Sequence, residues 1–199
     1  MTPLAPGFHP VPRGMVATVV TYLEMTTPAS ERPAPDLDGI RFAPLEADVA
    51  AYRDLFARVG AQDWLWFSRM QMADDALAAI LNDPDVTLHT LLKDGTPEAL
   101  LELDFREDGA CELAFFGVTP TLLGTGAGRL LMNRAIRLAW QRPITQFHVH
   151  TCTLDHPGAL GFYRRSGFTP IRQDIEIAPD PRLIGVLPED AGPHVPIFP

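Results

Sequence analysis

The chain has 199 residues, a formal net charge of −9 at pH 7, 46% hydrophobic residues and 21% charged residues. This length and composition fit one globular domain with a full hydrophobic core. The acidic balance argues against a nucleic-acid partner, because proteins that bind nucleic acid present clustered positive charge. Apolar runs such as residues 16–20 are far too short to span a membrane, so we expect no membrane partner.

The two cysteines, Cys111 and Cys152, form neither a C-x-x-C pair nor a disulfide framework. Such sparse cysteine usage is typical of a reducing compartment. Residues 1–13 are rich in proline and lack the basic segment and apolar core of a secretory leader. We therefore expect a cytoplasmic protein.

Twenty prolines divide the chain into a core and two arms. They are sparse between about residues 45 and 169, where each stands at an expected turn, and crowded on both sides of it. We predict a single domain over 1–199. Its core lies at about 40–177, between a proline-rich N-terminal arm (1–39) and a proline-rich C-terminal tail (178–199).

The predicted elements alternate between strands and helices. In the N-terminal arm, β-branched residues predict a strand at 15–25, and Asp48 can cap a helix that runs to about Val59. Further strands are expected at 40–45, 86–92, 99–105, 111–118, 144–152 and 168–177, and further helices at 74–81, 126–142 and 157–166. This order predicts a mixed sheet in an α/β domain, with a right-handed helical crossover between two parallel strands.

A strand with one carboxylate, Glu112, is followed by a glycine turn and a helix whose first turn has no acidic residue. The first amides of a helix lack partners and carry partial positive charge, which suits an anion. Gly124, Gly126 and Gly128 let a phosphate approach the backbone without a Cβ in the way. The pattern predicts a phosphorylated carrier held beside a strand that carries a base.

These residues resemble the GNAT superfamily of acyl-coenzyme A-dependent N-acyltransferases. The resemblance rests on 112–132, on the strand from Ile144, and on 156–168, and it extends over about 86–168. It implies a GNAT-like fold: a mixed, mostly antiparallel sheet flanked by helices, with splayed parallel strands at the cofactor cleft. No final strand is evident in the C-terminal tail, so we expect 15–25 to fill that place in the sheet.

The resemblance also assigns catalytic roles. Glu112 matches the family's base, and Tyr163 matches the tyrosine that protonates the departing coenzyme A thiolate. The cofactor-binding positions that it implies are Phe116, Gly117, Val118, Leu123, Gly124, Thr125, Gly126, Ala127, Gly128, Arg129, His156, Ala159 and Phe162. The Phe116 amide is expected at the thioester carbonyl and Val118 along the pantetheine arm, while Gly117 between them suits a β-bulge.

Two positions depart from the family pattern. The family's Gln or Arg falls on Leu123, so phosphate binding is expected to rely on backbone amides with help from Arg129, and Arg164 or Arg165 can also meet phosphates. The family's Asn falls on His156, which we expect in a segment (155–157) that caps the next helix and lines the cofactor slot. A Rossmann unit is the alternative for the glycine turn, but the third glycine of its motif is missing.

An aromatic cluster stands where the family places its acceptor site. Trp64, Trp66, Phe67 and Met70 suit a substrate with an apolar or flat part, although ordinary packing of helix on sheet explains them equally well. Charged candidates for holding an amine are Asp63, Glu102 and Asp104.

A metal site is the minor alternative. His148, His150 and Cys152 alternate onto one face of a strand and His156 follows, but no second donor cluster accompanies them. We expect no metal.

The sequence thus predicts an N-acetyltransferase that moves an acetyl group from acetyl-CoA to a small-molecule or peptide amine by direct attack in a ternary complex. Neither cysteine is obviously activated, which disfavours an acyl-enzyme. A catalytically silent acyl-CoA-binding module, serving as sensor or scaffold, is the alternative. The family often forms dimers, so a homodimer through the final strand or the arms is a further expectation.

Overall fold

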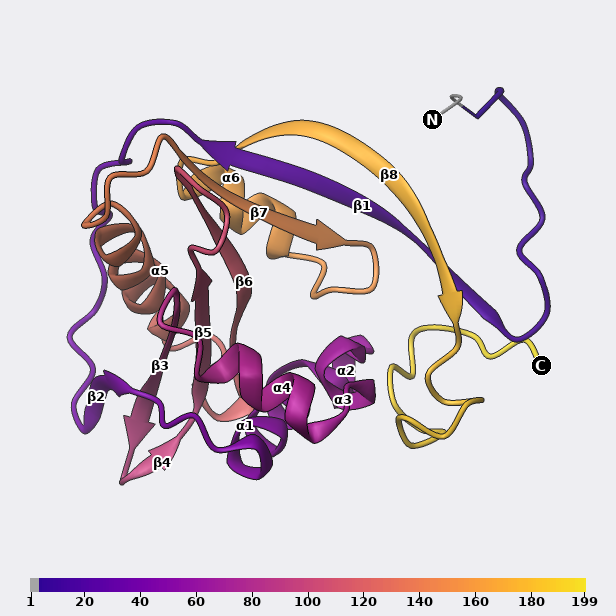
Figure 1. Cartoon of the computed structure of the whole chain (residues 1–199), viewed down its shortest axis with the longest axis horizontal. Coiled ribbons are helices and arrows are strands. Elements are labelled where there is room, and N and C mark those ends of the chain that lie inside the picture. Colours follow the sequence, from indigo (N-terminus) through magenta and orange to yellow (C-terminus); the bar gives the residue numbers. More distant parts are fainter. Residues whose placement is uncertain (1–3) are drawn as a thin grey trace.

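The computed structural model describes residues 4–199, which are organised around one eight-stranded sheet (Figure 1). The strand order is β2-β3-β5-β6-β7-β1-β8, with β4 paired to β3. The strands are β1 (Met15–Met25), β2 (Ile40–Pro44), β3 (Val86–Lys93), β4 (Thr96–Pro97), β5 (Ala99–Asp104), β6 (Ala110–Val118), β7 (Gln146–Cys152) and β8 (Thr169–Pro179).

Helices cover both faces of the sheet. They are α1 (Val49–Phe56), the π-helical turn η1 (Ala57–Ala61), α2 (Gln62–Trp64), α3 (Ser68–Gln71), α4 (Asp74–Leu81), the 3-10 turn η2 (Pro120–Leu122), α5 (Ala127–Ala139) and α6 (Ala159–Arg165). Helix α5 packs into one apolar cluster with Leu101, whereas α1 and α4 share the other cluster with Leu100. Adjacent residues of β5 therefore point to opposite helical layers, as the pleat of a strand requires.

The only parallel strand pair within residues 4–199 is β6 with β7, which α5 connects. Its register begins at Ala110 opposite Gln146 and ends at Glu112 opposite His148. Beyond Glu112, β6 no longer pairs with β7. The expected mixed, mostly antiparallel sheet with splayed parallel strands is confirmed.

The strand expected at 15–25 lies inside the sheet as β1, antiparallel to both neighbours. It pairs with β7 from Val20 opposite Cys152 to Met25 opposite Phe147, and with β8 along nearly its whole length. Figure 1 shows β1 and β8 as a long curved ribbon that extends past the other strands. The prediction that this N-terminal segment fills the missing place in the sheet is confirmed.

The helix expected from Asp48 to Val59 begins as predicted, since the Asp48 carboxylate accepts a hydrogen bond of 2.7 Å from the Ala51 amide. It changes to a π-helical turn after Phe56. A Cβ at Gly60 would lie 2.0 Å from the Trp66 ring, so this glycine lets the indole pack directly on the turn.

Beyond β8 the C-terminal segment is held by a buried ion pair. Arg182, 4% exposed, bonds to Asp180 and donates to the carbonyls of Ala191 (3.1 Å) and Val195 (2.8 Å). The Gly192 amide then donates to a carbonyl of α2 (2.8 Å). This segment therefore lies against the helices that follow α1. No helix within residues 4–199 is long and apolar enough to cross a bilayer.

Candidate active site

A cleft with a volume of about 710 Å³ lies where β6 and β7 diverge. The predicted site residues that line it are Glu112, Phe116, Gly117, Val118, Leu123, Gly128, His156, Ala159, Phe162, Tyr163, Trp64, Trp66 and Phe67. Those that do not line it are Gly124, Thr125, Gly126, Ala127, Arg129 and Met70. One cleft therefore holds the expected base, the expected acid and most of the aromatic cluster.

The irregularity in β6 lies at Ala114, not at Gly117. Glu102 pairs with Phe115 and the next residue, Leu103, pairs with Leu113, which leaves Ala114 as the extra residue. Gly117 is regularly paired, so the expectation of a bulge there was wrong. Its lack of a side chain serves packing instead, because a Cβ would lie 2.5 Å from Val59 Cγ1.

The glycine turn presents amides without backbone partners. Within residues 4–199, no backbone hydrogen bond engages the amides of Gly124, Gly126 or Gly128. Gly126 is the N-cap of α5 with φ 90°, and the first turn of that helix has no acidic residue. A Cβ at Gly124 or Gly128 would meet no atom within 4 Å, whereas at Gly126 it would lie 2.4 Å from Pro35. The N-terminal arm thus covers one side of the turn and leaves the other open.

Three arginines gather beside this turn. Arg129 donates to Ser166 Oγ (3.0 Å) and lies over the Phe162 ring, while Arg32 of the N-terminal arm donates to the Arg165 carbonyl (2.8 Å). Burial, Arg32 and Arg165 together lower the pKa of Arg129. Within the described residues none of the three arginines forms an ion pair. This cluster is therefore an uncompensated positive charge next to open amides.

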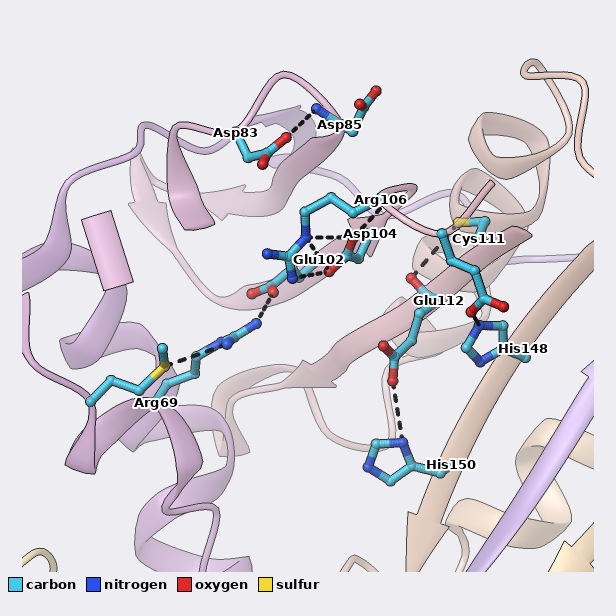
Figure 2. Close-up of polar contacts among 12 residues, drawn as sticks. Arg69, Asp83, Asp85, Glu102, Asp104, Arg106, Cys111, Glu112, His148 and His150 are labelled. Atoms are coloured by element: carbon cyan, nitrogen blue, oxygen red, sulfur yellow. Dashed lines mark hydrogen bonds and ion pairs between the residues drawn. The ribbon is translucent and has the colours of Figure 1, made fainter. Parts of the chain in front are cut away.

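Glu112 forms a pair that the sequence reasoning missed. His150, two residues beyond Glu112's partner in the β6–β7 register, places Nδ1 3.3 Å from Glu112 Oε1 (Figure 2). The contact with His150 lowers the pKa of Glu112, and the same contact raises the pKa of His150. The sequence did contain a clue to this pair. His148 and His150 stand at alternate positions on a strand that was predicted to run parallel to the strand carrying Glu112.

Tyr163 lies at the α6 side of the cleft and is 7% exposed. Its ring packs against Phe116, Phe162 and Phe168. Burial raises the pKa of Tyr163, and the charge of Asp155 adds to that shift. The phenol therefore stays protonated over the physiological range and is available as a donor.

Asp155 organises the aromatic end of the cleft. It accepts hydrogen bonds from Trp66 Nε1 (2.8 Å), Thr151 Oγ1 (2.6 Å) and the Cys152 amide (2.9 Å). It does not cap α6, whose N-cap is Gly158, so the capping role expected for 155–157 was wrong for this carboxylate. The competing bond to Trp66 comes from a residue distant in sequence, which local reasoning cannot detect.

The remaining aromatic residues differ in their surroundings. The Trp64 ring packs against two histidine rings. Its centroid lies 5.1 Å from that of His156 and 5.3 Å from that of His194 in the C-terminal segment. His156 Nδ1 accepts from the Gly158 amide (2.9 Å). Met70 lies outside the cleft lining and packs against the α1–α4 cluster.

Two of the three carboxylates considered for holding an amine are already engaged. Glu102 is fully buried, accepts from Tyr52 (2.5 Å) and pairs with Arg69. Asp104 pairs with Arg106 through two nitrogens (Figure 2). Asp63 lines the cleft.

The metal alternative receives no geometric support from the described residues. His148 contacts Glu107 (3.7 Å), whereas His150 contacts Glu112. Residues 4–199 contain no group of three or more His, Cys, Asp or Glu side chains arranged to hold a metal ion.

Comparison with known proteins places the sequence in a family. The sequence pattern of the acetyltransferase (GNAT) family matches residues 50–168. A GCN5-related N-acetyltransferase from Sphaerobacter thermophilus is 14% identical with a TM-score of 0.63; the match covers 86% of this chain and 53% of that one. A GCN5-related N-acetyltransferase from Kribbella flavida is 20% identical with a TM-score of 0.54. This match covers 86% of this chain and 63% of that one.

A smaller neighbour is an aminoglycoside acetyltransferase from an uncultured soil sample, solved with sisomicin: 14% identity, TM-score 0.53, covering 65% of this chain and 88% of that one. No curated protein matches the sequence. This chain spans between about half and two thirds of the length of the first structures that it resembles. At these identities the structures support the fold, while the family pattern covers more than half of the chain. The chain belongs to the GNAT family of acetyltransferases.

Proposed function

We propose that this protein transfers an acetyl group from acetyl-CoA to a primary amine by direct attack in a ternary complex. The observation that carries the proposal is that Glu112, the Phe116 segment and Tyr163 line one cleft, which reaches the open side of the glycine turn at Gly128.

The cofactor end is assigned to the backbone. The free amides of Gly124, Gly126 and Gly128 would hold the pyrophosphate, and the positive cluster of Arg129, Arg165 and Arg32 offsets the polar side chain missing at Leu123. The pantetheine arm would then follow Val118 and Phe162 toward the acyl group. A Phe116 amide aimed at the thioester oxygen contributes about 3 kcal/mol to the transition state.

The chemistry needs one base and one acid. A protonated alkylamine has a pKa of about 10.4, so it must lose a proton before or as its nitrogen attacks the thioester carbon. We assign Glu112 to the base, acting directly or through a group between it and the amine. The C–S bond then breaks, and Tyr163 gives its phenolic proton to the thiolate. The products are an amide and the free thiol.

An acyl-enzyme is disfavoured by the cysteines. Cys152 lines the cleft, but burial raises its pKa, and burial raises the pKa of Cys111 as well. A protonated thiol is a poor nucleophile.

The acceptor end is walled by Trp64, Trp66 and Phe67 with Asp63 nearby, which supports an amine that carries an apolar or flat part. A small molecule and a peptide remain the two classes to compare. The aminoglycoside activity of a structural neighbour makes an aminoglycoside one member of the test panel.

The test is thiol release from acetyl-CoA with a panel of an aminoglycoside, a free amino acid, a lysine-containing peptide and a simple alkylamine. We expect turnover with at least one amine and a loss of at least about tenfold in both Glu112→Gln and Tyr163→Phe.

The departures at Leu123 and His156 motivate the alternative, a silent acyl-CoA-binding module. Tight coenzyme A binding in calorimetry, combined with no thiol release on any amine, would favour that module over the enzyme.

A further inference from the structure

We propose that His150 is a catalytic residue of this cleft, that its Nε2 accepts the proton lost by the acceptor amine, and that Glu112 orients its ring through Nδ1. This inference rests on the proposed acetyl transfer and identifies the group through which Glu112 acts.

The geometry distinguishes the two ring nitrogens. His150 Nδ1 lies 3.3 Å from Glu112 Oε1 (Figure 2). Both side chains line the cleft, as Tyr163 does. A carboxylate facing Nδ1 favours the neutral tautomer whose proton is on that nitrogen. Nε2 is then the unprotonated nitrogen, and it carries the lone pair that a base needs.

The ring is held from a second side. Tyr22 of β1 packs against His150 in a tilted arrangement with ring centroids 5.8 Å apart, and the Arg172 guanidinium of β8 lies over the Tyr22 ring, 4.0 Å from its centroid. The His150 side chain is still half-exposed. It is therefore oriented by neighbours yet accessible to a ligand in the cleft.

The electrostatics favour His150 over Glu112 as the group that accepts the proton. The contact with His150 lowers the pKa of Glu112, so this carboxylate is a weaker base than an ordinary one. The same contact raises the pKa of His150, with Asp155 and Glu176 adding to the shift against the effect of burial. A base is most effective when its pKa lies near the working pH. An imidazole raised from about 6.5 meets that condition, and a lowered carboxylate does not.

The charged and titratable groups around the pair come from every neighbouring element. They are Glu112 and Asp104 with its partner Arg106 on the β5–β6 side, Asp155 after β7, His148 on β7, and Glu176, Arg172 and Tyr22 on the β8–β1 side. The carboxylates outnumber the cations here, so the surroundings as a whole stabilise the imidazolium.

The amine nitrogen forms a bond to the thioester carbon and gives one proton to Nε2, so that His150 becomes an imidazolium paired with the Glu112 carboxylate. The C–S bond breaks, the sulfur takes the electron pair, and the thiolate accepts the Tyr163 proton. His150 then passes its proton to the tyrosinate, directly or through water, which restores both residues.

The experiment is the pH dependence of kcat/KM for acetyl-CoA and the panel amine that turns over fastest, measured for the full chain and for His150→Gln, Glu112→Gln and His148→Gln. His148 is the matched control, because it lies on the same strand, contacts Glu107 and does not line the cleft. The limb set by the amine's own pKa is common to all four proteins and serves as an internal reference.

We expect His150→Gln to lower kcat/KM by about 10²-fold. Its pH profile should also lose the limb in which kcat/KM rises with pH above about 6.5, because that limb reports the loss of a proton from the imidazole. Glu112→Gln should retain that limb but move it to lower pH, since the pKa of His150 falls once the carboxylate is gone. His148→Gln should keep the limb and stay within about threefold of the starting rate, because His148 acts on Glu112 only through its charge. A His150→Gln protein that keeps the limb and stays within about threefold of the starting rate would overturn the proposal.

An imidazole titration by NMR in the full chain tests the pair without turnover. We expect the pKa of His150 to lie above about 6.5 and to fall in Glu112→Gln. An unchanged His150 titration in Glu112→Gln would also overturn the proposal. Failure of the proposed function looks different, because the unsubstituted protein would then release no thiol with any amine.

Discussion

The two ends of the cleft are built by different means. At the proposed cofactor end, the contacts available to a ligand are backbone amides in one short segment around Gly126, which comes shortly after strand β6 in the chain. At the aromatic end, the wall depends on side chains that meet from remote positions. Trp66 bonds to Asp155, and Trp64 contacts His194 of the C-terminal segment.

This contrast has a functional meaning. A backbone-built subsite tolerates changes in most side chains and suits a ligand common to a whole family. A subsite assembled from remote side chains changes with every packing partner and suits discrimination among acceptors. Substitutions at the two ends should therefore separate cofactor affinity from acceptor preference.

The largest expected effect is at Gly126. Gly126→Ala forces a non-glycine residue to φ 90° and drives its Cβ to 2.4 Å from Pro35, so the turn must shift. Strain of this kind amounts to about 1–3 kcal/mol, and we expect coenzyme A affinity to fall at least about tenfold by calorimetry.

Gly128→Ala is the informative companion of that variant. It has ordinary helical geometry and no atom within 4 Å of the added Cβ, so its Tm should rise, as is usual for Gly to Ala inside a helix. Its coenzyme A affinity should nevertheless fall, because the Cβ stands where a phosphate would approach. Unchanged affinity in both variants would contradict a backbone-built phosphate site.

The next largest effect is at Trp66. Trp66→Phe keeps an aromatic ring but removes the 2.8 Å bond from Nε1 to Asp155. A lost hydrogen bond of this type costs about 1 kcal/mol, so we expect the acceptor KM to rise about fivefold. Steady-state kinetics should show the KM for acetyl-CoA unchanged. Trp64→Phe is the control for loss of indole area, and a matching rise in the acetyl-CoA KM would show that the two ends are not separable.

A smaller effect is expected at Arg32, which brings the N-terminal arm into the cofactor end. Arg32→Gln removes one of three clustered cations without removing an ion pair, and an exposed charge contact contributes about 0.2–1 kcal/mol. We expect coenzyme A affinity to fall about threefold, with a weaker salt dependence. The matched control is Arg41→Gln, an exposed arginine on β2. Equal effects in the two variants would point to net charge alone.

The sequence predicted the elements that depend on local pattern. The β-branched run at 15–25, the glycine turn and the order of strands are local or nearly so. The resemblance to the GNAT family pointed to Glu112 and Tyr163, and both line the same cleft. The place of 15–25 in the sheet followed from counting the strands that the fold requires.

The sequence could not give features set by pairing between remote segments. The extra residue at Ala114 depends on the register of β5 against β6, which a glycine in the same strand obscured. Asp155 resembled a helix cap because its bond to Trp66 is invisible along the chain. His150 was considered as a metal ligand, since only the β6–β7 register reveals that it faces Glu112.

The smallest predicted effect is the contribution of the Glu112–His150 pair to stability, and its sign follows from the two pKa shifts. The pKa of His150 is raised in the folded protein, so its contribution is full below about pH 6.5 and is lost as pH rises through the folded value. The pKa of Glu112 is lowered, so its contribution is full above about pH 4.5 and is lost as pH falls through the folded value. The pair is therefore most stabilising between about pH 4.5 and 6.5.

The side chains of His150 and Glu112 are 50% and 33% exposed, which limits this contribution to roughly 0.5 kcal/mol or less. Urea unfolding of the full chain and of His150→Gln at pH 5.5 and pH 9 should show a difference in unfolding free energy that shrinks at the higher pH, and a difference that grows instead would contradict a charged pair in the cleft.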